Sequence, residues 1–591
     1  MRDTTSLSSS CIDSKSAKSL NDLPNEILLL IFSHVDPHRE DRILGHIPDD
    51  PSNPHLINDF LINSKGLCSL ALTCKRFLPL AQEQLLYAPV IGGCVTVSRS
   101  NLAQTRMICL LRTLLANPER TQYVKQLRLC LPMYEGGAGR LDEVVEVVEN
   151  SESGASITVK KQAYEAIKSL NLPLHMKERW QFQMSLNVER ALVGLFFALR
   201  PQLERMCIAQ STSSTRVEST ELYDYNYITL YDYMRNPFGL DSQENTGVSV
   251  SGFGGLQVTP SLTYLKVVSR LPMKLHGLEV FPNLRTLDMS TKLANYSRRT
   301  IRPISALYAS PEMRETLQNI HHLRLDFQIK SVGIWDIGAR VCLTSILQAF
   351  QSLQSLDCYA EPSDSKNPFR SVRAFPHYQA NIQHYPDAPP RLDVHAESQD
   401  YWDQRIYDAR TEITNYQHLV DALVHLRPQL ETLRLPGGFW TLPGGMRKPL
   451  PRFDGFARLS MLSVPQAAVL SVKLDNMRFA DVHGDFELSP VRVLPLSLRH
   501  LKVFDADVSF LESEWLRELF VQQKSCNFWP GLVWLEILLG PSCKEGEVEE
   551  VMARRSQLDF WAWVKEATFE VFVGRDLEVP QSASSKVLLR D

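Results

Sequence analysis

Residues 428–435 read Pro-Gln-Leu-Glu-Thr-Leu-Arg-Leu, and this phrase recurs along the chain of 591 residues. The last residues of the phrase alternate between apolar and polar, so Leu433 and Leu435 fall on one face of a short strand. Its proline cannot continue a helix, because it lacks the backbone N–H and clashes with the preceding turn. The phrase therefore predicts a turn that leads into a strand with one buried face.

The same pattern, Pro-x-Leu-x-x-apolar-x-apolar, begins at four other positions, which are Pro201, Pro260, Pro282 and Pro530. Looser copies keep the apolar spacing but lack the proline. They are Val124/Leu127/Leu129, Ile320/Leu323/Leu325, Leu353/Leu356/Cys358, Leu459/Leu462/Val464 and Leu498/Leu501/Val503. A pattern that recurs at so many places predicts a repeated structural unit.

Apolar stretches with helical spacing precede several copies, at residues 191–199, 343–350 and 419–426. Helix, turn and strand in this order are the unit of a leucine-rich repeat solenoid, in which stacked units pool their apolar sides into one core. We expect an α/β fold whose residues 91–540 form an irregular solenoid of this kind, with parallel strands on the concave face and helices outside. Residues 541–591 should hold a C-terminal cap, made of a helix and a strand, and a tail.

The spacing of the copies is irregular, so we expect insertions near residues 136–190, 209–258 and 361–416. The second insertion contains a run of tyrosines, a residue type that is enriched in binding surfaces. We select Tyr223, Tyr225 and Tyr227 as candidates for binding a partner protein; the alternative is an ordinary inserted strand. The other candidates, at solvent-facing positions of the repeats, are Arg285 and Arg434.

The N-terminal part carries a second signal, residues 20–35, which read Leu-Asn-Asp-Leu-Pro-Asn-Glu-Ile-Leu-Leu-Leu-Ile-Phe-Ser-His-Val. Pro24 suits the first turn of a helix, where its missing N–H would have no partner, and Glu26 is favourable near a helix N-terminus. Ile27 and Ile31 recur at helical spacing, and the leucines beside them widen the apolar surface. A helix with two apolar sides can cover both only if a second molecule packs against it, so the segment predicts a partner.

A following segment, residues 67–77, reads Leu-Cys-Ser-Leu-Ala-Leu-Thr-Cys-Lys-Arg-Phe. Together the two segments resemble the F-box, a three-helix module that docks on the SKP adaptor of cullin-type ubiquitin ligases. The family pattern has Leu-Pro-x-Glu, an Ile-Leu row, and a Leu-rich helix that ends in a basic pair and an aromatic residue. We place the F-box at residues 20–90, with Phe77 where many members carry tryptophan and a proline-containing loop inserted over residues 37–66.

The resemblance implies a substrate-recognition subunit of an SCF-type ubiquitin ligase, whose partners are an SKP-type adaptor, a cullin bound through it, and an unknown target protein. The repeats resemble the degenerate leucine-rich repeats behind many fungal-type F-boxes and would bind the target. The alternative is a non-catalytic F-box and leucine-rich repeat scaffold that acts outside ubiquitin transfer. The adaptor-binding residues implied are Leu20, Leu23, Pro24, Glu26, Ile27, Ile31, Leu67, Leu70, Leu72, Lys75 and Arg76.

The composition argues against several other functional classes. The net charge is −4 and no run of about 18 apolar residues occurs, so neither nucleic acid nor a membrane is an expected partner. Residues 1–19 are rich in serine and lysine and predict a disordered leader. The eleven scattered cysteines favour free thiols in a reducing compartment, hence the cytoplasm or nucleus. No catalytic set, metal-ligand set or cofactor motif stands out, so we expect a receptor subunit and not an enzyme.

Overall fold

The structure is a computed structural model of the chain. It describes residues 23–34, 65–91, 100–132, 154–170, 174–185, 189–199, 202–211, 261–269, 278, 281–291, 311–328, 347–361, 416–437, 451–470, 489–540, 553, 559–575 and 587–588.

A single sheet of thirteen strands organises the described residues, and its strands lie side by side in the order of the sequence. Strands β1 to β12 are parallel, and β13 pairs with β12 in the antiparallel sense. The strands are β1 Val90–Ile91, β2 Gln126–Pro132, β3 Arg205–Ser211, β4 Tyr264–Ser269, β5 Thr286–Thr291, β6 His322–Gln328, β7 Ser355–Glu361, β8 Thr432–Arg434, β9 Met461–Pro465, β10 His500–Ala506, β11 Trp534–Leu539, β12 Glu570–Arg575 and β13 Val587–Leu588.

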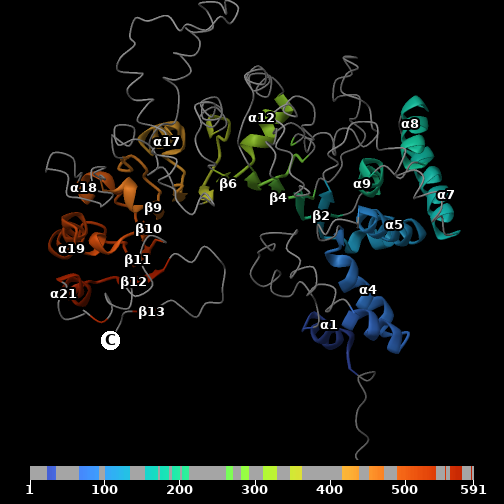
Figure 1. The fold of residues 1–591 in the computed structure, drawn as a ribbon, viewed down its shortest axis with the longest axis horizontal. Coiled ribbons are helices and arrows are strands. Elements are labelled where there is room, and N and C mark those ends of the chain that lie inside the picture. The colour runs from blue at the N-terminus through green and yellow to red at the C-terminus, as the bar shows by residue number, and fades with distance from the viewer. Residues whose placement is uncertain are drawn as a thin grey trace, which may run out of the picture.

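Helices lie before the first strand and in the connections between strands. The α-helices are α1 Asn25–His34, α4 Phe77–Tyr87, α5 Ser100–Ala116, α7 Gly154–Ser169, α8 Leu174–Ser185, α9 Glu189–Ala198, α12 Pro311–Gln318, α17 Tyr416–Ala422, α18 Pro490–Val493, α19 Glu514–Cys526 and α21 Asp559–Glu566. Residues 65–73 are also helical. The 3-10 helices are η2 Pro118–Tyr123, η9 Val424–Leu426, η12 Gln466–Ala468 and η13 Val508–Glu512. Figure 1 shows the strands along the inner side of an arch, with helices such as α12 and α19 on its outer side.

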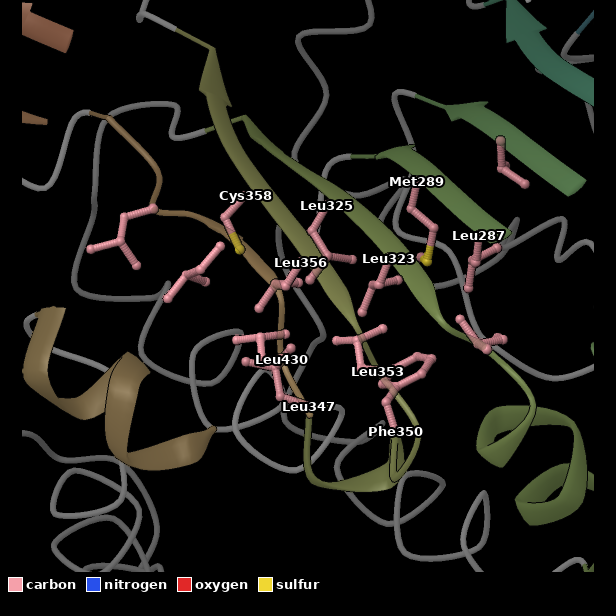
Figure 2. Close-up of a cluster of buried hydrophobic side chains, with 14 of the residues drawn as sticks. Leu287, Met289, Leu323, Leu325, Leu347, Phe350, Leu353, Leu356, Cys358 and Leu430 are labelled. Atoms are coloured by element: carbon pink, nitrogen blue, oxygen red, sulfur yellow. The ribbon is translucent and has the colours of Figure 1, made fainter. Parts of the chain in front are cut away.

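All ten copies of the repeated phrase are strands of this sheet, β2 to β11, so the predicted parallel strands are confirmed. Their apolar residues are in register: Leu287 pairs with Leu323, and Leu323 pairs with Leu356. These side chains are enclosed. Figure 2 shows Leu323 and Leu356 beside Leu353 and Phe350, which come from the turn before β7. One face of the sheet therefore contributes to the larger of two hydrophobic cores in the described residues.

A repeated hydrogen bond sets the level at which each strand begins. The N–H of Glu431, just before β8, donates to the carbonyl of Gln354, just before β7, at 2.7 Å. The N–H of Ser460 then donates to the carbonyl of Glu431 at 2.9 Å, and the N–H of Arg499 to that of Ser460 at 2.8 Å. Because the residue before each strand is fixed to its neighbour, all strands present equivalent residues side by side.

Several predicted boundaries need correction. Lys65 and Gly66 are helical and do not belong to the inserted loop at 37–66. Ser211 still belongs to β3, Glu361 still belongs to β7, and Tyr416 begins α17, so the insertions at 209–258 and 361–416 are shorter than predicted. The insertion at 136–190 contains α7 and α8.

The predicted helix and strand near the C-terminus are α21 and β12. However, β12 continues the parallel sheet beside β11, and only β13 changes direction. None of the described helices is both long and apolar enough to cross a lipid bilayer.

Candidate functional site

The N-terminal helices form a small core of their own. Leu28 and Phe32 from α1 meet Phe77 and Ala81 from α4, and the Phe32 and Phe77 rings lie edge to face with centroids 5.5 Å apart. Leu67 completes this core and has no exposed surface. We therefore correct its predicted role: Leu67 supports the module from inside and cannot line a docking surface.

Arg76 is exposed and also makes hydrogen bonds within the module. Its guanidinium Nη2 donates to the carbonyl of Leu23 at 2.6 Å and to Asn25 Oδ1 at 2.9 Å. These bonds fasten the start of α1 to the turn before α4. Arg76 thus holds two helices of the module together, whereas the adjacent Lys75 is simply exposed.

Four large apolar side chains of this module remain exposed. They are Ile27 (42 %), Leu30 (58 %), Leu72 (86 %) and Leu78 (39 %). Helical geometry explains the exposure of Leu72. The stripe that packs inward consists of Leu67, Leu70, Ala71 and Cys74, and Leu72 falls outside it. The module thus buries one apolar side of its helices and leaves apolar side chains exposed on all three helical segments.

The remaining predicted docking residues are divided between surface and core. Pro24 and Glu26 are exposed, whereas Leu23, Ile31 and Leu70 are half-buried against the module's core. Leu20 lies outside the described residues. Leu78 was not among the predicted docking residues, although its place one residue after the inward-facing Phe77 already turns it about 100° away from the core.

Helix α4 connects this module to the sheet. Its first half contributes Phe77 and Ala81 to the small core, and its second half contributes Leu86 to the large core of the sheet. The chain enters β1 soon after α4 ends. At the end of α4, the carbonyl of Tyr87 accepts a hydrogen bond from the N–H of Lys125 at 3.0 Å. One helix shared by two cores fixes the module against the sheet (Figure 1).

The inner face of the sheet carries a row of alternating charges. In each strand, the residue between the two buried apolar positions points away from the core, because side chains alternate along a strand. These residues are neighbours across the sheet. The charge row, from β4 to β11, consists of Lys266, Asp288, Arg324, Asp357, Arg434, Ser463, Lys502 and Glu536.

Ion pairs connect members of the charge row. Asp288 lies between two cations, with 3.6 Å from its Oδ2 to Lys266 Nζ and 3.8 Å from its Oδ1 to Arg324 Nε. Lys502 Nζ lies 3.3 Å from Glu536 Oε2. Burial raises the pKa of Asp357, and the neighbouring guanidinium groups of Arg434 and Arg324 oppose that rise.

Aromatic rings border the C-terminal part of the row. The guanidinium carbon of Arg434 lies 4.5 Å from the centre of the Phe504 ring on β10, a cation–π geometry that holds the side chain in place. The rings of Trp534 and Phe572 stack with centroids 3.9 Å apart. This end of the inner face therefore combines charge with aromatic surface.

The predicted partner-binding residues fall into two groups. Tyr223, Tyr225 and Tyr227 lie outside the described residues. Arg285 is exposed just before β5, and Arg434 is a member of the charge row, so the structure does not bring the two arginines to one site. In the part of the chain that the structure describes, no cluster of three or more His, Cys, Asp or Glu side chains could hold a metal ion.

Comparison with known families assigns the N-terminal module. Residues 20–90 match the family model described as F-box-like, which covers α1, residues 65–73 and α4. No curated protein matches the chain.

Proposed function

We propose that the chain is the substrate receptor of an SCF-type ubiquitin ligase, acting in the cytoplasm or nucleus. The F-box-like module would bind an SKP-type adaptor, and a cullin would join through that adaptor. The chain would contribute no catalytic residue, because its role is to hold a target near the ligase and so raise the effective concentration of target lysines.

The observation that carries this proposal is the exposed apolar side of the module. Leu30 and Leu72 are among the most exposed apolar residues of the described chain, and they belong to the segment that matches the F-box-like family. Burying one such side chain contributes about 1.5–3 kcal/mol. Covering several of them would supply a substantial part of the free energy of an adaptor complex.

The sheet supports the second half of the proposal. Its strands follow the sequence order, its apolar residues repeat in register, and helices cover its outer side, which are the features of a leucine-rich repeat-like solenoid. The inner face is then the surface for a target protein. Because α4 belongs to both cores, a target on this face would be held at a fixed distance from the adaptor.

A pull-down with purified SKP-type adaptor tests the proposal. The full chain should retain the adaptor, and the double substitution Leu30→Asp with Leu72→Asp should abolish retention. The matched control is Leu496→Asp, because Leu496 is also a highly exposed leucine (65 %) but lies in the sheet region. Equal adaptor retention by the double variant and the control would refute the docking assignment. Co-purification of cullin would separate a ligase receptor from a scaffold that binds the adaptor alone.

A further inference from the structure

The residue just before each strand lies at the edge of the sheet where the strands begin. Lys125, before β2, and Glu204, before β3, are neighbours along this edge, because the N–H of Glu204 donates to the carbonyl of Lys125 at 2.8 Å. Their side chains form an ion pair, with 3.6 Å between Lys125 Nζ and Glu204 Oε1. At this place a cation before one strand therefore has an acidic partner before the next.

Arg499 and Val533 repeat this backbone arrangement before β10 and β11. The N–H of Val533 donates to the carbonyl of Arg499 at 2.9 Å, but a valine side chain carries no charge. On the other side of Arg499, Ser460 separates it from Glu431, whose carboxylate is already paired with Arg458 at 2.6 Å. Arg499 is exposed, and its guanidinium forms no ion pair or hydrogen bond in the part of the chain that the structure describes. An acid from another molecule can therefore reach it.

Three exposed apolar side chains lie close to Arg499. Leu496 (65 %) is three residues before it in the same turn, and Val533 (52 %) is its neighbour along the edge. Met461 (46 %) is on β9, where it pairs with His500, the residue after Arg499. Exposed apolar residues that occur singly are normal, whereas several of them together are typical of an interaction site.

Two packing contacts hold the polar and aromatic parts of this surface in place. The Trp534 ring, next to Val533, stacks on Phe572 with 3.9 Å between the ring centroids. A Cβ atom added at Gly531 would lie 3.6 Å from Arg499 Cγ, so the stem of Arg499 passes over this glycine toward β11. Side chains that are already ordered lose little conformational entropy when a partner binds. Arginine and tryptophan are also enriched among the residues that dominate the binding energy of interfaces.

A second edge cation shows that an exposed arginine alone does not make such a surface. Arg285, before β5, is exposed and has no side-chain ion pair with the described residues. Its neighbours along the edge are Thr263 and His321, which are hydrogen-bonded to its backbone at 2.9 and 2.8 Å. Both neighbours of Arg285 are polar, whereas Arg499 has the exposed Val533 beside it.

We propose that the surface around Arg499 binds a segment of a partner protein in which an acidic residue stands beside apolar residues. The edge patch, as we call this surface, consists of Met461, Leu496, Arg499, Val533 and Trp534. A carboxylate of the partner takes the place beside Arg499 that Glu204 has beside Lys125, and the planar guanidinium can hold both of its oxygens. Apolar residues next to that acid cover the exposed apolar side chains of the patch. The proposal rests on the proposed function only in that the partner is taken to be the ligase target.

A selection from random peptides displayed on phage tests what the edge patch binds. The immobilised full chain is the bait, and an excess of soluble Arg499→Glu chain removes peptides that bind elsewhere, for example to the F-box-like module. We expect the recovered peptides to carry aspartate or glutamate next to large apolar residues. The tightest of them, labelled with fluorescein and measured by anisotropy, should bind Arg499→Glu at least about tenfold more weakly than the unsubstituted chain, or about 1.4 kcal/mol.

Filling the patch from within the chain gives a second, independent variant. Val533→Asp places an acid beside Arg499 as Glu204 stands beside Lys125, and Val533→Asn is its neutral control. Val533→Asp should bind the labelled peptide at least about fivefold more weakly than Val533→Asn, a loss typical of a residue that dominates an interface. Arg314→Gln, which changes an exposed arginine of α12 on the outer side of the arch, should leave peptide binding unchanged.

Charge reversal protects the test against misfolding. The same peptide with lysine in place of its acid should bind Arg499→Glu more tightly than it binds the unsubstituted chain. The proposal is overturned if no peptide is recovered, if the recovered peptides lack an acid, or if Val533→Asp and Val533→Asn bind equally. A dimer of the full chain that dissociates in Arg499→Glu, measured by sedimentation, would also overturn it, because a second copy would then occupy the patch. Since no adaptor takes part, each of these failures leaves the adaptor pull-down, and thus the proposed function, to be judged separately.

Discussion

Leucines of the sheet and leucines of the F-box-like module have opposite environments. Leu287, Leu323 and Leu356 are enclosed on the core face of the sheet, whereas Leu30 and Leu72 of the module are largely exposed. Each strand alternates apolar and polar residues, so its apolar side is covered by the turns and helices of the same chain. The module carries apolar residues on two sides and covers only one. We therefore expect the first set to determine stability and the second set to bind the adaptor.

The largest effect on stability should come from shortening a buried side chain of the sheet. Leu356→Ala removes a buried side chain between two strands, and we expect the free energy of unfolding to fall by about 2–5 kcal/mol. The exposed Leu496 provides the control, because Leu496→Ala should change that free energy by no more than about 0.5 kcal/mol. Urea denaturation followed by circular dichroism measures both. Equal losses of unfolding free energy in the two variants would contradict the proposed difference between buried and exposed leucines.

Two leucines of one helix sharpen the comparison inside the module. Leu67→Ala should reduce stability by about 2–5 kcal/mol, because it leaves a cavity in the small core. Leu72→Ala, five residues away on the exposed side, should change stability by less than about 0.5 kcal/mol and weaken adaptor binding. Denaturation and adaptor titration of the two variants check this. A Leu72→Ala variant that is destabilised while its adaptor affinity is unchanged would contradict the assignment.

Substitution of Arg76 should cause a loss of stability between those of Leu67→Ala and Leu72→Ala. Its bonds to Leu23 and Asn25 involve a charged donor at the surface, so Arg76→Ala should cost about 1 kcal/mol of stability. Its effect on adaptor binding should be indirect, through the position of α1. If Arg76→Ala abolishes adaptor binding while stability and hydrogen exchange of α1 are unchanged, Arg76 is a direct contact after all.

The smallest effect concerns the charge row. The folded-state pKa of Asp357 lies above its unfolded value, so folding favours the protonated carboxyl, and this contribution is present at acidic pH and is lost as pH rises through the folded-state pKa. Asp357→Asn removes the titration. We expect the stability of this variant relative to the unsubstituted chain to increase between acidic and neutral pH. A difference that stays constant or decreases over that range would show that the two arginines dominate over burial.

Strands β2 to β11 were predictable because each carries its own signal, whereas β1 and β13 carry no copy of the phrase and were not predicted. The phrase at Leu433 and Leu435 needs no distant residue to be recognised, and the same spacing located strands as different as β2 and β11. The small core was only partly predictable: α1 was recognised as two-sided, but the roles of Leu67 and Leu72 depend on which side of their helix meets Phe77. That choice is made by tertiary packing.

The charge row was not predicted, although its signal was present. Asp357 and Arg434 are far apart in the sequence, and the insertion between them hides their adjacency on β7 and β8. Reading the residue between the last two apolar positions of each phrase gives the row directly. The boundaries of the insertions could not be predicted, since strands such as β3 and β7 extend past the phrase by hydrogen bonds that the apolar pattern does not encode.

Titration calorimetry of the full chain with purified SKP-type adaptor tests the central claim most directly, because burial of apolar surface gives a negative heat-capacity change on binding. We expect binding with a clearly negative heat-capacity change, unaltered by Leu496→Asp and weakened more than about tenfold, or about 1.4 kcal/mol, by Leu72→Asp. Adaptor binding with a heat-capacity change near zero and an unchanged affinity for Leu72→Asp would contradict the account.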